Sequence, residues 1–156
     1  MTDEQAKSRA GFGKPEIVQV ASGKAVVEWG HVRFADIPQF HQSAQARIAA
    51  ALSEQNIKTA GPHITFSRPP SDGSIELAPG VMVQTAFKPV GAVTIQEIPA
   101  GAAAHMKLEA SYDNLPQAWG ALMAWIETQT LQSAGLHWEI YGDPAVPVTD
   151  LYVLLK

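Results

Sequence analysis

The residues with the clearest potential for chemistry lie in one short stretch near the C-terminus, residues 135–141. Apolar and polar side chains alternate there, which predicts a β-strand with His137, Glu139 and Tyr141 on one face. The other face, which includes Trp138, is expected to pack against the helix that precedes the strand. A carboxylate on such an apolar strand must be solvated, paired with a cation of the protein, or available to a positively charged ligand. The sequence alone leaves these three alternatives open for Glu139.

The elements that position this stretch follow from patterns along the chain. Strands are predicted at 16–21, 25–29, 63–66, 93–98, 102–108, 135–141 and 151–155, with 16–21 and 25–29 joined as a hairpin at Ser22-Gly23. A further strand is predicted to start at 75–77, within the loop described below, and to continue through 81–83 towards Phe87. Asp36-Ile37-Pro38-Gln39 reads as a helix start with a capping box, and Gly61-Pro62 as its stop. Asn114-Leu115-Pro116-Gln117 repeats that start, and Gly135 is the expected end of the second helix. Residues 67–80 read as a loop that either bridges two strands or forms a lid.

The second half of the chain repeats the first. A shift of 78 residues pairs Gly23 with Gly101, Phe34 with Tyr112, Pro38 with Pro116 and Gln39 with Gln117; after a slip of four residues, Gly61 pairs with Gly135, His63 with His137 and Thr65 with Glu139. The chain is therefore predicted to be an α+β domain with antiparallel sheets, two helices and two ββαββ halves around a pseudo-twofold axis.

A groove along that axis is expected to be the ligand cleft, lined by His63, Thr65, His137, Glu139 and Tyr141. Only one half carries the acid, so Glu139 is not a requirement of the fold. Two histidines without further ligands do not make a metal site, and no metal or cofactor is expected.

Composition narrows the class of protein. The chain has 156 residues, no cysteine and a net charge of -4, which excludes a disulfide framework and disfavours nucleic acid as a direct partner. No apolar run is long enough to span a membrane, and no signal peptide is evident, so a cytoplasmic protein is expected. Residues 1–14 are predicted to be a disordered leader, and residues 15–156 a single domain.

Several segments resemble one family. Ile98-Pro99-Ala100-Gly101 resembles its "lPaG" turn, Tyr112-Asp113-Asn114-Leu115 its "GPYd.l" strand end and helix, and Trp138-Glu139-Ile140-Tyr141 its "wEiY" strand. With the duplicated layout, these segments make the chain similar to the GyrI-like small-molecule-binding domain, which also serves as the effector-binding domain of AraC- and MerR-type regulators. The resemblance covers roughly residues 16–156.

The resemblance implies an aromatic-lined cleft with a central glutamate, which maps to Glu139. Members of the family bind lipophilic, often cationic compounds, and some branches hydrolyse cyclopropane-bearing natural products. Two features depart from the family pattern. Ala110-Ser111 stand where Gly-Pro is usual, and Leu108 stands where a histidine is common, so roles that need that histidine are not expected.

Several aromatic residues have two interpretations. Tyr112 either closes a strand-to-helix corner or joins Glu139 and Tyr141 in the site, and Trp29 and Trp125 belong either to the core or to the cleft wall. Trp119 and Trp138 are assigned to the core from helical spacing and strand parity.

Two functions remain open. The favoured one is a stand-alone protein that binds a lipophilic, positively charged small molecule through Glu139, Tyr141, Tyr112, His137, Thr65 and His63. The alternative is a hydrolase of strained, cyclopropane-bearing electrophiles, in which Glu139 activates water and Tyr141 assists. The oligomeric state does not follow from the sequence.

Overall fold

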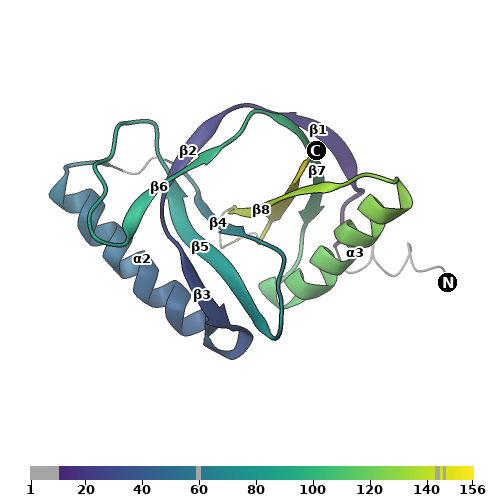
Figure 1. Cartoon of the computed structure of the whole chain (residues 1–156), viewed down its shortest axis with the longest axis horizontal. Coiled ribbons are helices and arrows are strands. Elements are labelled where there is room, and N and C mark those ends of the chain that lie inside the picture. Colours follow the sequence, from purple (N-terminus) through teal and green to yellow (C-terminus); the bar gives the residue numbers. More distant parts are fainter. Residues whose placement is uncertain (1–10, 59–60, 143–144, 146) are drawn as a thin grey trace. The chain divides into compact units, whose positions relative to one another are not determined.

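The computed structural model describes residues 11–58, 61–142, 145 and 147–156 (Figure 1). These residues form two α-helices and nine β-strands that pair antiparallel, an α+β fold. In chain order the elements are β1 (Glu16–Val20), β2 (Gly23–Glu28), β3 (Gly30–Arg33), η1 (Phe34–Asp36), α2 (Ile37–Glu54), β4 (His63–Ser67), β5 (Ser74–Met82), β6 (Val93–Ile98), β7 (Gly101–Leu108), η2 (Tyr112–Asn114), α3 (Leu115–Thr128), β8 (Ser133–Tyr141) and β9 (Thr149–Leu155).

The chain divides into two compact units. The central unit is Ala21–Ala100, and the terminal unit combines the residues up to Val20 with Gly101–Lys156. Within the central unit the strand order is β4-β5-β2-β6, with β3 also paired to β5. Within the terminal unit the order is β8-β9-β7-β1. Each unit therefore holds one helix and a run of three strands in the same sequence-relative order, β4-β5-β2 and β8-β9-β7, while the pseudo-twofold axis stays a prediction.

The predicted hairpin of the first two strands is wrong. Strand β1 pairs with β7, so that Val20 lies opposite Gly101, and β2 pairs with β6, so that Gly23 lies opposite Ile98. Gly23 begins β2 and is not among the glycines with positive φ, so Ser22-Gly23 does not form the tight turn that a hairpin needs. The first strand of the chain completes a sheet whose other strands follow more than eighty residues later.

Part of the predicted leader is ordered. The backbone N–H of Gly13 donates to the carbonyl of Lys107 at 2.6 Å, and the N–H of Glu109 donates to the carbonyl of Gly11 at 2.7 Å. These bonds place residues 11–13 beside the end of β7. Residues 1–10 of the expected leader lie outside the described part.

Both predicted helix starts are correct in position. Helices α2 and α3 begin at Ile37 and Leu115, 78 residues apart, and each has a proline in its first turn. The predicted capping box is wrong, because Asp36 already has helical backbone angles after the turn of η1 and its side chain makes no capping bond. Helix α3 has 14 residues and α2 has 18, so the four-residue slip in the repeat corresponds to about one helical turn.

The helices end earlier than Gly61 and Gly135 suggested. Asn56 and Thr130, each with φ of 56°, follow the last turns of α2 and α3. The residues after them, Ile57 and Leu131, donate backbone bonds back into the helix ends. The expected loop at 67–80 is also shorter, because β5 begins at Ser74 and only residues 68–73 connect it to β4. A long lid there is therefore excluded.

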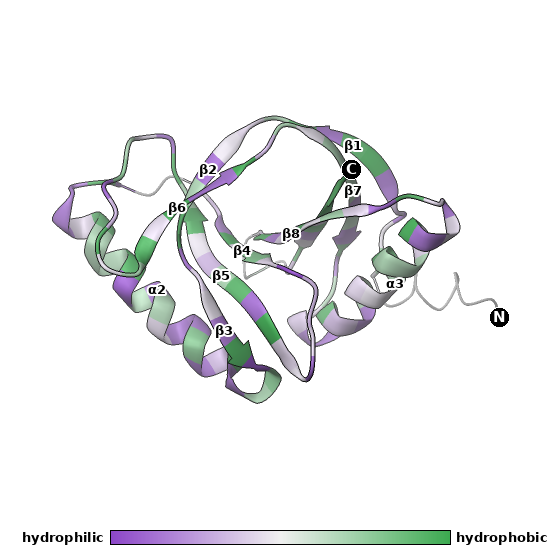
Figure 2. Ribbon diagram, in the orientation of Figure 1, coloured by the Kyte–Doolittle hydropathy of each residue, from purple (hydrophilic) through white to green (hydrophobic). Residues whose placement is uncertain are grey.

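Each unit has its own core between its helix and its strands. Figure 2 shows hydrophobic and hydrophilic residues interleaved along both helices, as expected for helices with one buried face. The central core contains Val26, Ile48, Ala51, Leu52, Val81, Val83, Phe87 and Val93. The terminal core contains Ala104, Met106, Leu108, Ala118, Leu122, Ile126, Leu151 and Val153. None of the described helices is long and apolar enough to cross a membrane.

One ion pair links helix and sheet inside the central unit. The Arg47 guanidinium on α2 donates from Nε to Glu28 Oε1 at 2.6 Å and from Nη2 to Oε2 at 2.7 Å. The Glu28 side chain is 7% exposed, whereas that of Arg47 is 51% exposed. A two-bond pair of this kind satisfies a carboxylate that would otherwise be buried without a counter-charge.

This asymmetry predicts which partner is costlier to remove. Arg47→Met leaves a buried carboxylate unpaired, while Glu28→Gln leaves a guanidinium that water can still solvate. We therefore expect Arg47→Met to lower the free energy of unfolding more than Glu28→Gln does. Urea unfolding measures both. Arg33→Met is the control, because the Arg33–Asp36 pair is exposed, and it is expected to change stability by less than about 0.5 kcal/mol. An equal loss of unfolding free energy for Arg47→Met and Glu28→Gln would contradict the conclusion that the buried carboxylate is the partner that needs the ion pair.

Candidate functional site

The predicted strand parity around Glu139 is correct, but the face covered by the helix is the opposite of the one expected. On β8, His137 lies opposite Val153 of β9, and Glu139 lies opposite Leu151. Val153 and Leu151 belong to the core that packs beneath α3. Residues opposite each other in an antiparallel pair point to the same face, so α3 covers the face of His137 and Glu139 rather than that of Trp138.

A bulge at the start of β8 sets this register. The pairing with β9 shifts between Ser133 and His137, and Gly135 adopts φ of +95°, which only glycine takes without strain. The Ser133 hydroxyl accepts the N–H of Gly135 at 2.9 Å and lies 3.0 Å from Nε2 of His137. Gly135, predicted as a helix stop, therefore shapes the strand and fixes where the next side chains point.

The Glu139 carboxylate is held by two neutral donors. The indole N–H of Trp119, on α3, donates to Oε1 at 2.5 Å, and the phenol of Tyr141 donates to Oε2 at 2.6 Å. Each oxygen thus has one protein donor, while an ionised carboxylate offers about four acceptor sites. The arrangement orients the acid and leaves acceptor capacity on both oxygens.

The electrostatics of Glu139 are unusual for a strand residue. Burial raises the pKa of its carboxyl group, and the hydrogen bonds from Tyr141 and Trp119 oppose that rise without cancelling it. Among the ion pairs found in the described residues, none involves Glu139. One of the three alternatives open from the sequence therefore loses support, because the half-buried acid is not paired with a lysine or arginine of the described chain.

Aromatic rings surround this acid. Tyr112, in η2, makes an edge contact with Tyr141 at 5.8 Å between ring centroids. Tyr112 is 43% exposed, so it does not close a buried corner. Together with Trp119, these rings give Glu139 neighbours that are apolar and rich in π electrons. Such faces attract cations.

His137 has a different position from the one expected of a ligand-binding residue. It is buried, its ring stacks under Trp119 at 5.7 Å between centroids, and burial lowers its pKa. A neutral His137 therefore supports the indole that reaches Glu139. Its predicted contact with a ligand stays a prediction.

The two site residues predicted from the first half lie in the central unit. His63 and Thr65 are alternate residues of β4, His63 exposed and Thr65 buried. Thr65 Oγ1 lies 3.3 Å from Nε2 of His41, on α2. Whether His63 and Thr65 share a cleft with Glu139 stays a prediction. The described residues contain no cluster of three or more histidine and acidic side chains that could hold a metal ion.

Trp119 is the functional residue that the sequence reasoning missed. It was assigned to the core, and its ring does pack against the core of the terminal unit, but its N–H is directed at Glu139. The repeat contained a signal for this role. The 78-residue shift pairs Trp119 with His41, which reaches the equivalent strand position, Thr65, so both helices carry a nitrogen at that position.

The remaining tryptophans take structural positions. Trp138 is 1% exposed and stacks on Tyr152 at 5.4 Å, which confirms its assignment to the interior. Trp125 packs against the core of the terminal unit. Trp29 donates to Gln96 at 3.1 Å, and the Arg68 guanidinium lies 4.8 Å from its ring centroid.

Comparison with solved structures shows the same fold in several proteins. The chain matches EcmrR in a DNA complex with a TM-score of 0.75 and 16% identity, covering 98% of this chain and 62% of EcmrR. The separate C-terminal domain of EcmrR matches with a TM-score of 0.73 and 16% identity, over 92% of this chain and 98% of that domain.

A third structure, SAV2435 bound to tetraphenylphosphonium, has a TM-score of 0.67 and 13% identity, with 92% and 94% of the two chains covered. A hydrolase from Listeria innocua matches with a TM-score of 0.58 and 16% identity, over 98% and 97%. At these identities the likeness shows the fold alone. No curated protein sequence matches this chain.

The model of one sequence family, the GyrI-like small-molecule-binding domain, matches residues 14–156. That match covers nearly the whole chain and agrees with the fold of the structures above. The chain belongs to the GyrI-like small-molecule-binding domain family.

Proposed function

We propose that this protein binds a lipophilic cation, and that Glu139 recognises its positive charge. The observation that carries the proposal is the Glu139 carboxylate, which is half-buried and, within the described residues, is bonded by the neutral donors Trp119 and Tyr141 and has no cationic partner. Ionising such an acid is unfavourable until a positive charge arrives, so a cationic ligand gains more there than a neutral one.

The surrounding rings support the same ligand class. Tyr141 bonds the acid through its hydroxyl, and Tyr112 packs edge-on against Tyr141. Cation–π attraction contributes about 0.5–2 kcal/mol for each ring whose face meets the ligand. A related fold, that of SAV2435, has been solved with the lipophilic cation tetraphenylphosphonium. This makes tetraphenylphosphonium a suitable first probe.

A second candidate, hydrolysis of a strained electrophile such as a cyclopropane, shares the same residues. It is favoured by one observation: an acid whose pKa is raised is better matched to proton transfer near neutral pH than an ordinary carboxylate. Glu139 would take a proton from the attacking water. The Tyr141 hydroxyl, released from Glu139 once that acid is protonated, would hydrogen-bond the substrate atom that gains negative charge, and this atom would take up the proton as the strained bond breaks. Two chains of this fold from Listeria innocua are described as hydrolases.

The first prediction concerns stability and pH. Burial raises the pKa of folded Glu139 above its unfolded value of 4.5, so the folded state holds this proton more tightly. The stabilisation is fully present below the unfolded pKa and is lost as pH rises through the folded pKa. We expect the unfolding free energy of wild type, relative to Glu139→Gln, to fall across that interval in urea titrations. Glu127→Gln, an exposed control on α3, should follow the wild type. Parallel curves for all three proteins would show that Glu139 titrates normally.

The second prediction concerns the ligand. Glu139→Gln keeps the shape of the side chain and removes its charge, so it should weaken tetraphenylphosphonium by about 1–3 kcal/mol, as expected for loss of a charged partner. Triphenylphosphine oxide, which is neutral, should bind both proteins with similar affinity. Isothermal titration calorimetry measures the four dissociation constants, one for each compound with each protein. Equal losses for the cation and the neutral compound would mean that Glu139 supports the fold rather than charge recognition.

The third prediction separates binding from catalysis. The protein is incubated with aromatic compounds that carry a cyclopropane or an epoxide, and water addition is followed by mass spectrometry. A binder gives no turnover in wild type or in Glu139→Gln. A hydrolase gives multiple turnovers that fall by about 10²–10⁴-fold in Glu139→Gln, the usual contribution of a general base. The second result would replace the binding proposal with the hydrolase.

A further inference from the structure

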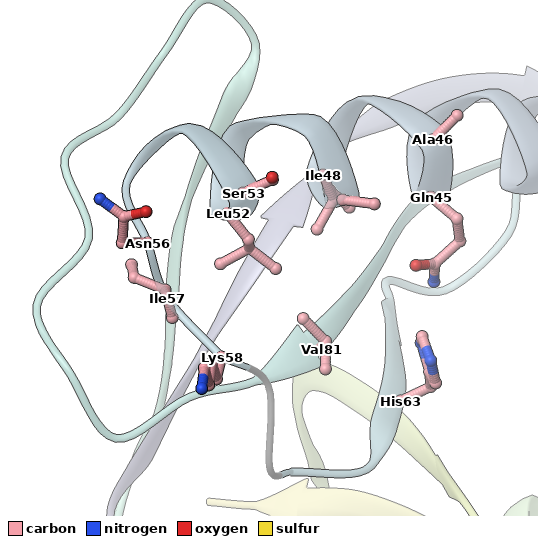
Figure 3. Close-up of a pocket in the computed structure, with 11 residues that line it drawn as sticks. Gln45, Ala46, Ile48, Leu52, Ser53, Asn56, Ile57, Lys58, His63 and Val81 are labelled. Atoms are coloured by element: carbon pink, nitrogen blue, oxygen red, sulfur yellow. The ribbon is translucent and has the colours of Figure 1, made fainter.

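The central unit has a groove that the proposed cation site does not use. It has a volume of about 850 Å³ and lies along α2, beside the strands β4 and β5 (Figure 3). Its apolar lining includes Ile48, Leu52, Ile57 and Val81. A volume of this size lies within the range of sites that bind drug-sized molecules.

The charge of this groove is opposite in sign to that of the Glu139 site. Lys58 lines it near Ile57 and Asn56, and His63 lines it near Gln45. None of its lining residues is acidic, although the chain as a whole has a net charge of -4. The ion pairs found in the described residues do not include Lys58. An apolar floor with one cationic group, Lys58, at its edge complements an amphipathic anion.

The repeat allows the two helices to be compared at equivalent positions. Helix positions 78 residues apart carry His41 and Gln45 on α2, and Trp119 and Met123 on α3. Trp119 stacks on His137 and, like Met123, packs against the core of the terminal unit. His137 is buried, whereas its counterpart in the repeat, His63, is exposed and lines the groove.

We propose that this groove is a second binding site, which takes an amphipathic organic anion: a carboxylate on an apolar, drug-sized body. The carboxylate pairs with Lys58, and the apolar body packs against Ala46, Ala49 and Ile57, above the buried side chains of the groove floor. His63 and Gln45 offer hydrogen bonds to a further polar group at the other end. The proposal does not depend on Glu139, so it can be tested independently of the cation site.

The test uses 4-biphenylacetate and its neutral amide, 4-biphenylacetamide, as probes, titrated into methyl-labelled full-length protein. We expect the acid to bind more tightly than the amide, to shift the methyl signals of Ile48, Leu52 and Ile57, and to weaken at high salt. Lys58→Met should reduce affinity for the acid about three- to fivefold, since an exposed ion pair contributes modestly, and should leave the amide unchanged. Ala49→Trp, which fills the groove from α2, should weaken both probes.

Two controls keep the result specific. Lys107→Met removes one exposed positive charge from β7, in the terminal unit, and should leave affinity for the acid unchanged. Glu139→Gln should also leave it unchanged, while it weakens tetraphenylphosphonium. The proposal is overturned if the acid binds no better than the amide, if Lys58→Met has no effect, or if the shifted methyl signals belong to Leu151 and Val153 instead.

Discussion

The terminal unit depends on one constraint, a half-buried carboxylate, Glu139, that two neutral donors hold in place. Glu139 receives a hydrogen bond from its own strand, through Tyr141, and another from α3, through Trp119. The indole reaches the acid only if α3 lies over this face of β8. The bulge at Gly135 sets which side chains that face carries. The position of α3, the register of β8 and the packing of the rings therefore all contribute to the position of Glu139.

The two halves of the repeat provide an internal comparison. Trp119 bonds Glu139 in the terminal unit, and at the corresponding positions His41 lies within hydrogen-bond distance of Thr65 in the central unit. The fold thus forms a helix-to-strand polar contact in both units and needs no acid to do so. The absence of an acid at the corresponding position, Thr65, is consistent with the proposed role of Glu139 toward a ligand.

Local sequence patterns predicted the helix starts and the strand faces, which depend on residues close together in the sequence. They did not predict the strand pairing, which depends on segments far apart in the sequence. Alternation assigned the face of Glu139 correctly, and the Pro-Gln starts located both helices. The turn signal Ser22-Gly23 predicted a hairpin, but β1 pairs with β7, about eighty residues further along the chain, and a local turn signal does not identify so distant a strand. Helical spacing assigns Trp119 to the core because it reflects the apolar character of the side chain. The contact of Trp119 with Glu139 depends instead on the indole N–H, which the spacing does not show. The joining of His63 and Thr65 with Glu139 still rests on the repeat alone.

Glu28 and Glu139 differ in the hydrogen-bond donors that hold their carboxylates. Glu28 is buried and bonded twice by Arg47, so its charge is already balanced within the central unit. Glu139 is half-buried, and its donors are an indole and a phenol, which orient a carboxylate without supplying positive charge. A counter-ion fixed in the protein would compete with any cationic ligand for that acid. Neutral donors avoid this competition, because they hold the geometry in place and leave the charge for the ligand to balance.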